Sequence, residues 1–144
     1  MKQAQAAIEF LLVIALSLVL VIPALTLFFN FTQDTTYEAL NGRVSRIGTA
    51  MVETTQSVYY YGNEASKVLV VDFPSKVNAL EINPQNKHEI IFTLEVPRGT
   101  TEAVFYSEIP LQGNFTQDKI TQGPKQFKFE NVNGTIMVSE LDVE

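Results

Sequence analysis

Cysteine is absent from this 144-residue sequence, which excludes disulfide bonds and metal sites built on thiolates. Histidine occurs once, at His88, and no nucleophile motif accompanies it, so a Ser/His/Asp arrangement has no support. The sequence also contains no glycine-rich phosphate loop and no set of zinc ligands. We therefore expect a protein that is not an enzyme and needs no cofactor or metal, with His88 exposed at the end of a strand.

Basic residues are scarce as well. The chain has 10 Lys and Arg against 16 Asp and Glu, for a formal net charge of −6. Binding DNA or RNA through phosphate contacts requires clustered Lys and Arg, so we expect no nucleic-acid partner. Three acids, Glu140, Asp142 and Glu144, alternate near the C-terminus; a weak calcium site is conceivable there, but a solvated charged face is the expected interpretation.

Charge is nearly missing from the N-terminal segment, where the apolar run from Gln5 to Phe29 contains only Glu9. About 20 apolar residues suffice for a helix to cross a bilayer, and a cleaved secretory signal has a shorter apolar core of about 7–15. We expect the run to be retained in the mature chain. Lys2 in the short polar head favours a cytoplasmic N-terminus. Pro23 predicts a kink or local loosening of the helix.

Beyond the apolar run, a seven-residue spacing predicts an amphipathic helix that continues to Tyr61 and ends at Gly62-Asn63. Gly42 falls on the polar face, so we do not expect it to break the helix. The predicted buried stripe comprises Tyr37, Leu40, Val44, Ile47, Met51, Val58 and Tyr61, and only Thr54 interrupts it. The Tyr59–Tyr61 cluster is expected to pack the helix end on a sheet with at most one ring exposed; a contact surface is the alternative.

After residue 65 the apolar period shifts toward two, which predicts strands. Asn133-Gly134 predicts a tight hairpin, residues 83–86 and 97–100 predict turns, and residues 111–124 are expected to form a long polar loop. The six expected strands are 67–73, 76–82, 89–96, 101–109, 125–132 and 135–143. The predicted fold class is α+β, with a long N-terminal helix packed on a C-terminal antiparallel β domain, most simply a β-sandwich.

The expected organisation has three parts: a leader at 1–4, a helix at 5–62, and an extracellular β domain at 65–144. Within the helix, residues 5–29 are the membrane-spanning part or filament core and residues 30–62 are amphipathic. Three Asn-x-Ser/Thr acceptors for glycosylation occur, at Asn30, Asn114 and Asn133. Asn114 is the best candidate because it lies in the expected loop, whereas Asn30 is near the membrane edge and Asn133 is in a tight turn.

A short positive head, a Gln-x-x-x-Glu start formed by Gln5 and Glu9, a long apolar helix and a distal β domain together resemble archaeal type IV pilins with class III signal peptides. The resemblance is specific over residues 2–30 and architectural beyond them. It implies that a prepilin peptidase cuts between Ala4 and Gln5, which makes Glu9 the fifth mature residue. Gln3-Ala4 departs from the family pattern of Lys or Arg followed by Gly before the cut.

The resemblance also implies a function. The chain would be a single-pass membrane precursor that an assembly ATPase and a platform protein polymerise into a helical homo-oligomeric pilus on the cell surface, serving adhesion. Glu9 would pair with the new amine at Gln5 of a neighbouring copy, and loosening at Pro23 would help copies fit the lattice. The adhesion target and a major or minor role stay open. The alternatives are a non-polymerising, membrane-anchored extracellular binding or envelope protein, or a minor pseudopilin.

Overall fold

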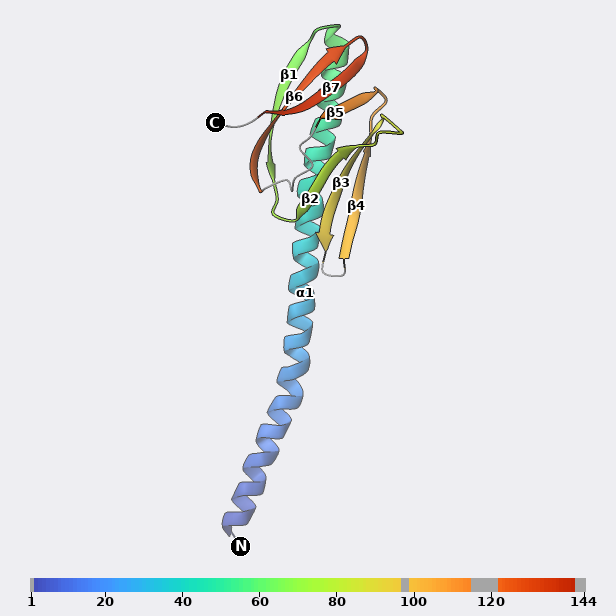
Figure 1. The fold of residues 1–144 in the computed structure, drawn as a ribbon. Helices are drawn as coiled ribbons and strands as arrows, with labels where there is room; N and C mark the ends of the chain where they lie inside the picture. The colour runs from blue at the N-terminus through green and yellow to red at the C-terminus, as the bar shows by residue number, and fades with distance from the viewer. Residues whose placement is uncertain (1, 97–98, 115–121, 142–144) are drawn as a thin grey trace. The chain divides into compact units, whose positions relative to one another are not determined.

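The computed structural model describes the backbone of residues 2–96, 99–114 and 122–141, and it describes their side chains except at residues 2–5, 33–36 and 114. The chain divides into two compact units, Met1–Glu38 and Ala39–Glu144, and one helix, α1 (Lys2–Tyr61), belongs to both. Seven strands follow α1 in the second unit (Figure 1). They are β1 (Ser66–Phe73), β2 (Val77–Ile82), β3 (Glu89–Val96), β4 (Gly99–Tyr106), β5 (Leu111–Asn114), β6 (Gly123–Val132) and β7 (Thr135–Leu141).

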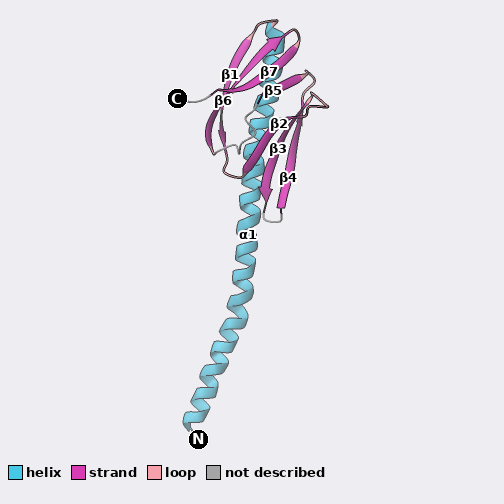
Figure 2. Cartoon of the chain, in the orientation of Figure 1, coloured by secondary structure: helices cyan, strands magenta, loops and turns pink. Residues whose placement is uncertain are grey.

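The strands form two sheets, a four-stranded sheet in the order β1-β6-β7-β5 and a three-stranded sheet in the order β2-β3-β4 (Figure 2). One long N-terminal helix packed on β sheets confirms the predicted α+β class. Two sheets are present, as a sandwich requires, and α1 contributes to the same core. All pairings are antiparallel except that of β5 with β7, which is parallel, so the four-stranded sheet is mixed and not purely antiparallel as predicted.

The sequence prediction missed β5, which occupies the start of the expected loop at 111–124. Leu111 is fully buried and lies opposite Ile136 of β7. A strand of four residues is too short to show alternation, and its pairing partner is distant in sequence. Residues 115–121 lie outside the described residues. The strand predicted at 101–109 was also wrong at its end, because β4 stops at Tyr106 and the chain then crosses to the other sheet.

One face of α1 in the second unit packs into the core, as the seven-residue spacing predicted. The buried apolar residues on this face are Leu40, Val44, Ile47, Met51 and Val58. Thr54, which interrupts the apolar pattern, is buried too. The neighbouring Thr55 is also buried, and its own hydroxyl donates a hydrogen bond to the Met51 carbonyl oxygen at 2.9 Å. The helix is therefore a structural part of the β unit over this range.

Phenylalanine rings join the two sheets inside the core. Phe73 of β1 stacks on Phe92 of β3 with 6.1 Å between ring centroids, and it lies 5.8 Å from the ring of Phe127 on β6. All three side chains are at most 1% exposed. Since these rings come from three strands and both sheets, the two sheets share one hydrophobic core.

The end of α1 is fastened to the β6–β7 hairpin by asparagine side chains. Asn131, only 4% exposed, donates from Nδ2 to the Gly62 carbonyl oxygen at 3.0 Å and accepts the Gly134 amide on Oδ1 at 3.0 Å. Asn63 accepts the Asn133 amide on Oδ1 at 2.9 Å. Asn133 and Gly134 both have positive φ, 52° and 84°, which confirms the predicted tight hairpin.

Gly48 of α1 is required because the ring of Phe105 on β4 lies directly against it. A Cβ atom at this position would overlap the ring, whose edge-to-face contact with Phe92, 5.5 Å between centroids, limits its movement. Gly42 offers a matched comparison on the same helix, because a Cβ there meets nothing within 4 Å. Both positions gain the same helix propensity when glycine becomes alanine.

We expect Gly48→Ala to be less stable than Gly42→Ala by about 1–3 kcal/mol, the usual penalty of overpacking a core. The free energy of unfolding of the two full-length variants in detergent measures this difference. Equal stabilities would show that the Phe105 ring moves without cost.

Candidate membrane-spanning and assembly segment

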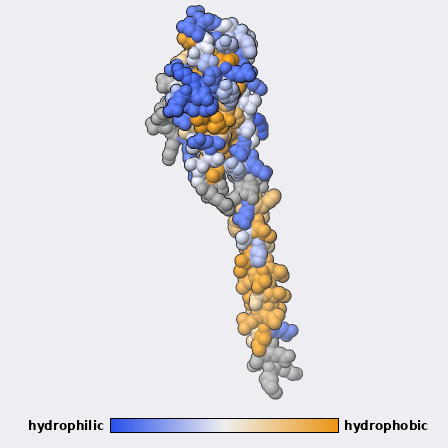
Figure 3. All heavy atoms as spheres, turned by 90° about the vertical axis from the view of Figure 1, so that its right-hand side faces the viewer, coloured by the Kyte–Doolittle hydropathy of each residue, from blue (hydrophilic) through white to orange (hydrophobic). Residues whose placement is uncertain are grey.

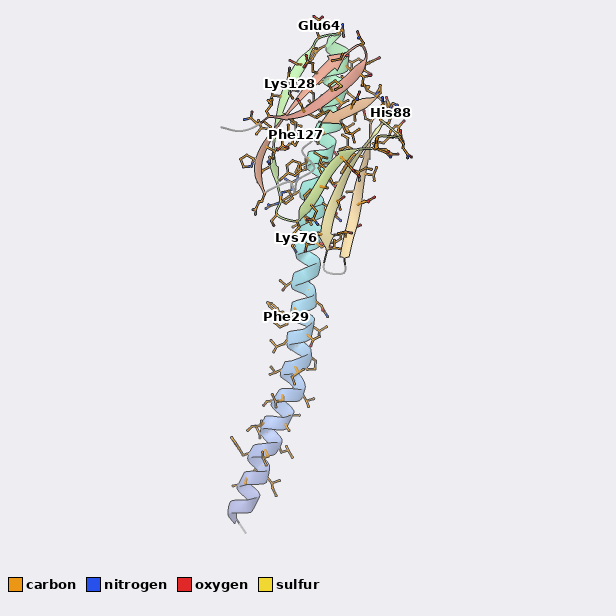
Figure 4. The ribbon with its side chains drawn as sticks, viewed as in Figure 1. Phe29, Glu64, Lys76, His88, Phe127 and Lys128 are labelled. Atoms are coloured by element: carbon orange, nitrogen blue, oxygen red, sulfur yellow. The ribbon has the colours of Figure 1, made fainter. Side chains whose placement is uncertain are left out.

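The first unit contains a helical segment whose apolar side chains are uncovered on every side. We call residues 6–32 of α1 the apolar segment. Its large hydrophobic side chains are between 40% (Ile14) and 72% (Phe31) exposed. In Figure 3 the visible face of this part of the helix is mostly orange, and the side chains project outward in Figure 4, where Phe29 is labelled. A helix that is hydrophobic all round belongs in lipid or inside a larger protein assembly.

The apolar segment is long and apolar enough to cross a membrane, by length and composition. From Ile8 to Phe31 it rises about 35 Å at 1.5 Å per residue. A bilayer hydrocarbon core is about 30 Å thick. The segment therefore has the dimensions of a single membrane span.

The hydroxyl groups inside the apolar segment find hydrogen-bond partners within the helix. The hydroxyls of Ser17, Thr26 and Thr32 each donate to a carbonyl oxygen four residues earlier, at 2.8, 3.0 and 2.9 Å. Because hydrocarbon offers no hydrogen-bond partner, such internal bonds allow hydroxyls to enter it. These residues do not interrupt the span.

Pro23 lies inside α1, and the helix continues on both sides of it. Proline has no amide hydrogen, so the carbonyl of Val19, four residues earlier, cannot receive its usual helical hydrogen bond. The predicted loosening around Pro23 stays a prediction.

Glu9 is the only charged residue between Lys2 and Asp34, and it is exposed on α1. Lys2 is seven residues away, about 10 Å along the helix axis, which is beyond the three or four residues that a direct ion pair spans. An ionised, unpaired carboxylate at the centre of a membrane helix costs about 2.5–3.5 kcal/mol on insertion scales. Glu9 therefore needs either a polar membrane interface or a cation from another chain.

The expected processing residues, Ala4 and Gln5, belong to α1, but their side chains lie outside the described residues. Cleavage between them stays a prediction. Of the expected glycosylation sites, Asn30 is exposed on α1 and Asn133 is exposed in the β6–β7 turn. Asn114 ends β5, and its side chain is not described. Glycosylation at all three likewise stays a prediction.

The expected burial of the tyrosine cluster was wrong. Tyr59, Tyr60 and Tyr61 are 41%, 80% and 74% exposed, and the rings of the first two make an edge contact at 5.8 Å. Tyr61 has the spacing of the buried stripe, but Val58 is the last residue of α1 that the sheets bury. The seven-residue spacing of apolar residues therefore continues along α1 beyond the part of the helix that the sheets cover.

His88 immediately precedes β3, as expected, but it is half-buried and not exposed. Its Nδ1 lies 2.9 Å from the Ser107 carbonyl oxygen, and its ring stacks on Tyr106 with 5.8 Å between centroids. The nearby Leu111 amide donates to the Lys87 carbonyl oxygen at 2.6 Å. These contacts give His88 a structural position at the crossover between the sheets, which lies at the edge of the β unit in Figure 4.

Of the three C-terminal acids, the structure describes only Glu140. Glu140 forms an ion pair with Lys125, with 2.8 Å between Oε1 and Nζ. Asp142 and Glu144 lie outside the described residues. Within the described ranges, no group of three or more His, Cys, Asp or Glu is placed to hold a metal ion.

One feature of the three-stranded sheet was missed by sequence reasoning. The buried residues Ile90, Phe92 and Leu94 of β3 face the core, so the alternate positions of the sheet face outward. Strands β2, β3 and β4 contain no Lys or Arg. We call this outer surface the acidic face, and its members include Glu81, Glu95, Glu102, Ile91, Val104 and Tyr106. The sequence already shows that these strands lack Lys and Arg. Only the strand register shows that their acidic residues share one surface.

Comparisons with protein-family models, with curated proteins and with solved structures found no match for this chain.

A lysine substitution distinguishes an uncovered segment that enters lipid from an exposed surface in water. Val19 near the middle of the apolar segment and Val70 on β1 are 66% and 60% exposed. We expect Val19→Lys to raise the apparent free energy of membrane insertion, measured by glycosylation mapping, by about 3–4 kcal/mol, because an unfavourable lysine replaces a favourable valine.

Val70→Lys is the control, and it should leave insertion unchanged because β1 stays in water. If both lysine variants insert as well as the unchanged chain, the apolar segment does not span the membrane.

Proposed function

We propose that this chain is the precursor of a structural subunit of a type IV-like archaeal pilus. It is a single-pass membrane protein with a cytoplasmic N-terminus until a prepilin peptidase cuts before Gln5. The mature chains then polymerise through the apolar segment into an extracellular filament that serves adhesion. Its work is mechanical, without catalysis.

One observation carries the proposal: the apolar side chains of residues 6–32 of α1 are exposed on all sides, and the same helix supplies core residues to the β unit from Leu40 onward. In lipid this surface is covered before assembly. In a filament, the same surfaces of neighbouring copies can cover one another, so the same helix serves both states. The resemblance of residues 2–30 to archaeal pilins supports this reading.

Glu9 gives the filament its axial register in this proposal. Cleavage before Gln5 creates an α-amine that is positively charged near neutral pH. The amine of one copy can pair with the Glu9 carboxylate of the next, which offsets the cost of burying both charges. A copy docked out of step would bury an unmatched charge, and breaking a buried pair costs about 3–5 kcal/mol.

The assembly machinery is proposed from the family resemblance. An assembly ATPase and a polytopic platform protein would lift the apolar segment out of the bilayer. Pro23 would loosen the helix locally and help neighbouring copies fit the helical lattice. A minor pseudopilin would use the same machinery.

A plain membrane anchor that never polymerises is the second candidate. Glu9 favours it in one respect, because it lies in the second or third turn of α1 and can reach the membrane interface near Lys2. In that case the carboxylate contacts water and no partner chain is needed.

N-terminal sequencing of surface material separates the two candidates. The pilus proposal expects fibres whose chains begin at Gln5. The anchor expects detergent-extracted single chains that keep Met1.

Substitution of Glu9 tests its pairing role. We expect Glu9→Gln to lower fibre yield by at least about 100-fold, as the loss of a buried ion pair implies, while membrane insertion of the precursor is retained. Fibre yield is measured by sedimentation and electron microscopy of sheared cells.

Glu38→Gln is the matched control, since Glu38 is exposed on the same helix but outside the apolar segment. It should assemble normally. Normal fibre yield from Glu9→Gln would contradict the pairing.

A further inference from the structure

The acidic face of the three-stranded sheet has an apolar centre. Ile91 and Val104 lie opposite each other in the β3–β4 register, and Val104 is 52% exposed. Tyr106 on the same face is 64% exposed. An apolar centre bordered by charges is the usual anatomy of a protein–protein interface.

Three carboxylates of the acidic face have no ion pair among the described residues. Glu89, also on this face, is already occupied, because its two oxygens accept the side-chain amides of Asn83 and Asn86 at 2.8 and 2.7 Å. Glu81, Glu95 and Glu102 are exposed. Ion pairs among the described residues involve only Lys125 with Glu140 and Lys128 with Glu130, so these three have none there.

Unpaired cations lie on another surface of the same unit. Arg43 and Arg46 are exposed on α1, one turn apart, and neither has an ion pair within the part of the chain that the structure describes. Together with Ala39 and Ala50 they follow the spacing i, i+4, i+7 and i+11, which places all four on one side of the helix. We call these four residues the arginine stripe.

The sequence of α1 offers the two arginines of the stripe no acidic residue at the spacing of an ion pair across one helical turn. No Asp or Glu lies three or four residues from Arg43 or Arg46, the positions that pair across one helical turn. The two arginines are themselves three residues apart, so they repel each other. An external anionic surface would remove this repulsion.

The spacings of the two surfaces correspond. Residues three apart on a helix have Cβ atoms about 5–6 Å apart. Glu95 and Glu102 are diagonal neighbours in the β3–β4 register, where the separation is about 7–8 Å. Long arginine side chains reach across this difference, and each guanidinium can bind a carboxylate through two parallel hydrogen bonds.

We propose that the acidic face of one copy binds the arginine stripe of a second copy of this chain. The inference rests on the proposed function, which brings copies side by side. Charge complementarity selects the second copy as the occupant, since the same folded unit carries both the cations and the anions. The contact joins two different surfaces, and such head-to-tail contacts generate open helical series when the rotation between copies does not close a ring.

Charge reversal on each surface tests the contact. The first variant is Arg43→Glu with Arg46→Glu, the second is Glu95→Arg with Glu102→Arg, and the third combines all four substitutions. Their formal net charges are −6 − 4 = −10, −6 + 4 = −2 and −6, respectively. We expect each single-surface variant to lower fibre yield by about tenfold, because like charges then meet. The combined variant should return to within about twofold of the unchanged chain.

Two controls separate the contact from general effects of charge. Lys67→Glu with Lys87→Glu also gives a net charge of −10, but these exposed lysines lie outside the arginine stripe and the acidic face, so the yield should not change. Mixing the two single-surface variants should restore co-assembly, because the reversed helix of one matches the reversed sheet of the other. Thermal unfolding of each variant in detergent verifies that it folds.

The outcomes distinguish this inference from the proposed function. If the single-surface variants assemble normally while Glu9→Gln does not, the contact is overturned and the pilus proposal stands. If folded variants lose fibres and neither the combined variant nor the mixture restores them, the contact is also overturned, and the arginines have another partner such as anionic lipid. If the unchanged chain forms no fibres, the proposed function itself fails.

Discussion

The apolar segment has to be kept out of water, and no other feature of the chain imposes so strong a constraint. The second unit closes its core with residues from Leu40 onward, while the large apolar side chains of the apolar segment are exposed. Burial of apolar surface is favourable at roughly 25 cal/mol per Å², which makes exposure of a whole helix untenable in water. In the proposed function, lipid covers the segment first and other copies of the helix cover it later, and in both cases the burial of the Glu9 carboxylate is costly.

A single helix therefore serves two environments. Its first part is apolar on all sides, whereas its second part places one face on the sheets and leaves the other polar, with Arg43 and Arg46 exposed. In the proposed filament, copies that cover one another's apolar segments also bring their β units close together. The proposed contact between neighbouring units then depends on surface charge, because the carboxylates of the acidic face and the guanidinium groups of Arg43 and Arg46, which have no ion pair among the described residues, occupy different surfaces of one unit.

The sequence was informative where a local pattern determines the structure. The stripe from Leu40 to Val58, the Asn133-Gly134 hairpin and the apolar segment each follow from residue spacing or turn chemistry. Short or distant pairings were not predictable, because β5 is recognisable only from its place beside β7. The exposure of the three tyrosines was not predicted. The spacing of apolar residues shows which face of α1 is buried, but it does not show at which residue the sheets stop covering that face. The acidic face similarly requires the register of three strands.

The residues of α1 that lie in the core of the second unit decide how that unit can be handled by itself. Strands β1 to β7 complete their core with Leu40, Val44 and Met51, so a fragment that starts at Ser66 would lack one wall of its interior. A water-soluble fragment must instead retain the helix from before Leu40 while omitting the residues up to Thr32. A fragment that begins between these two positions keeps the wall that α1 gives to the core of the second unit.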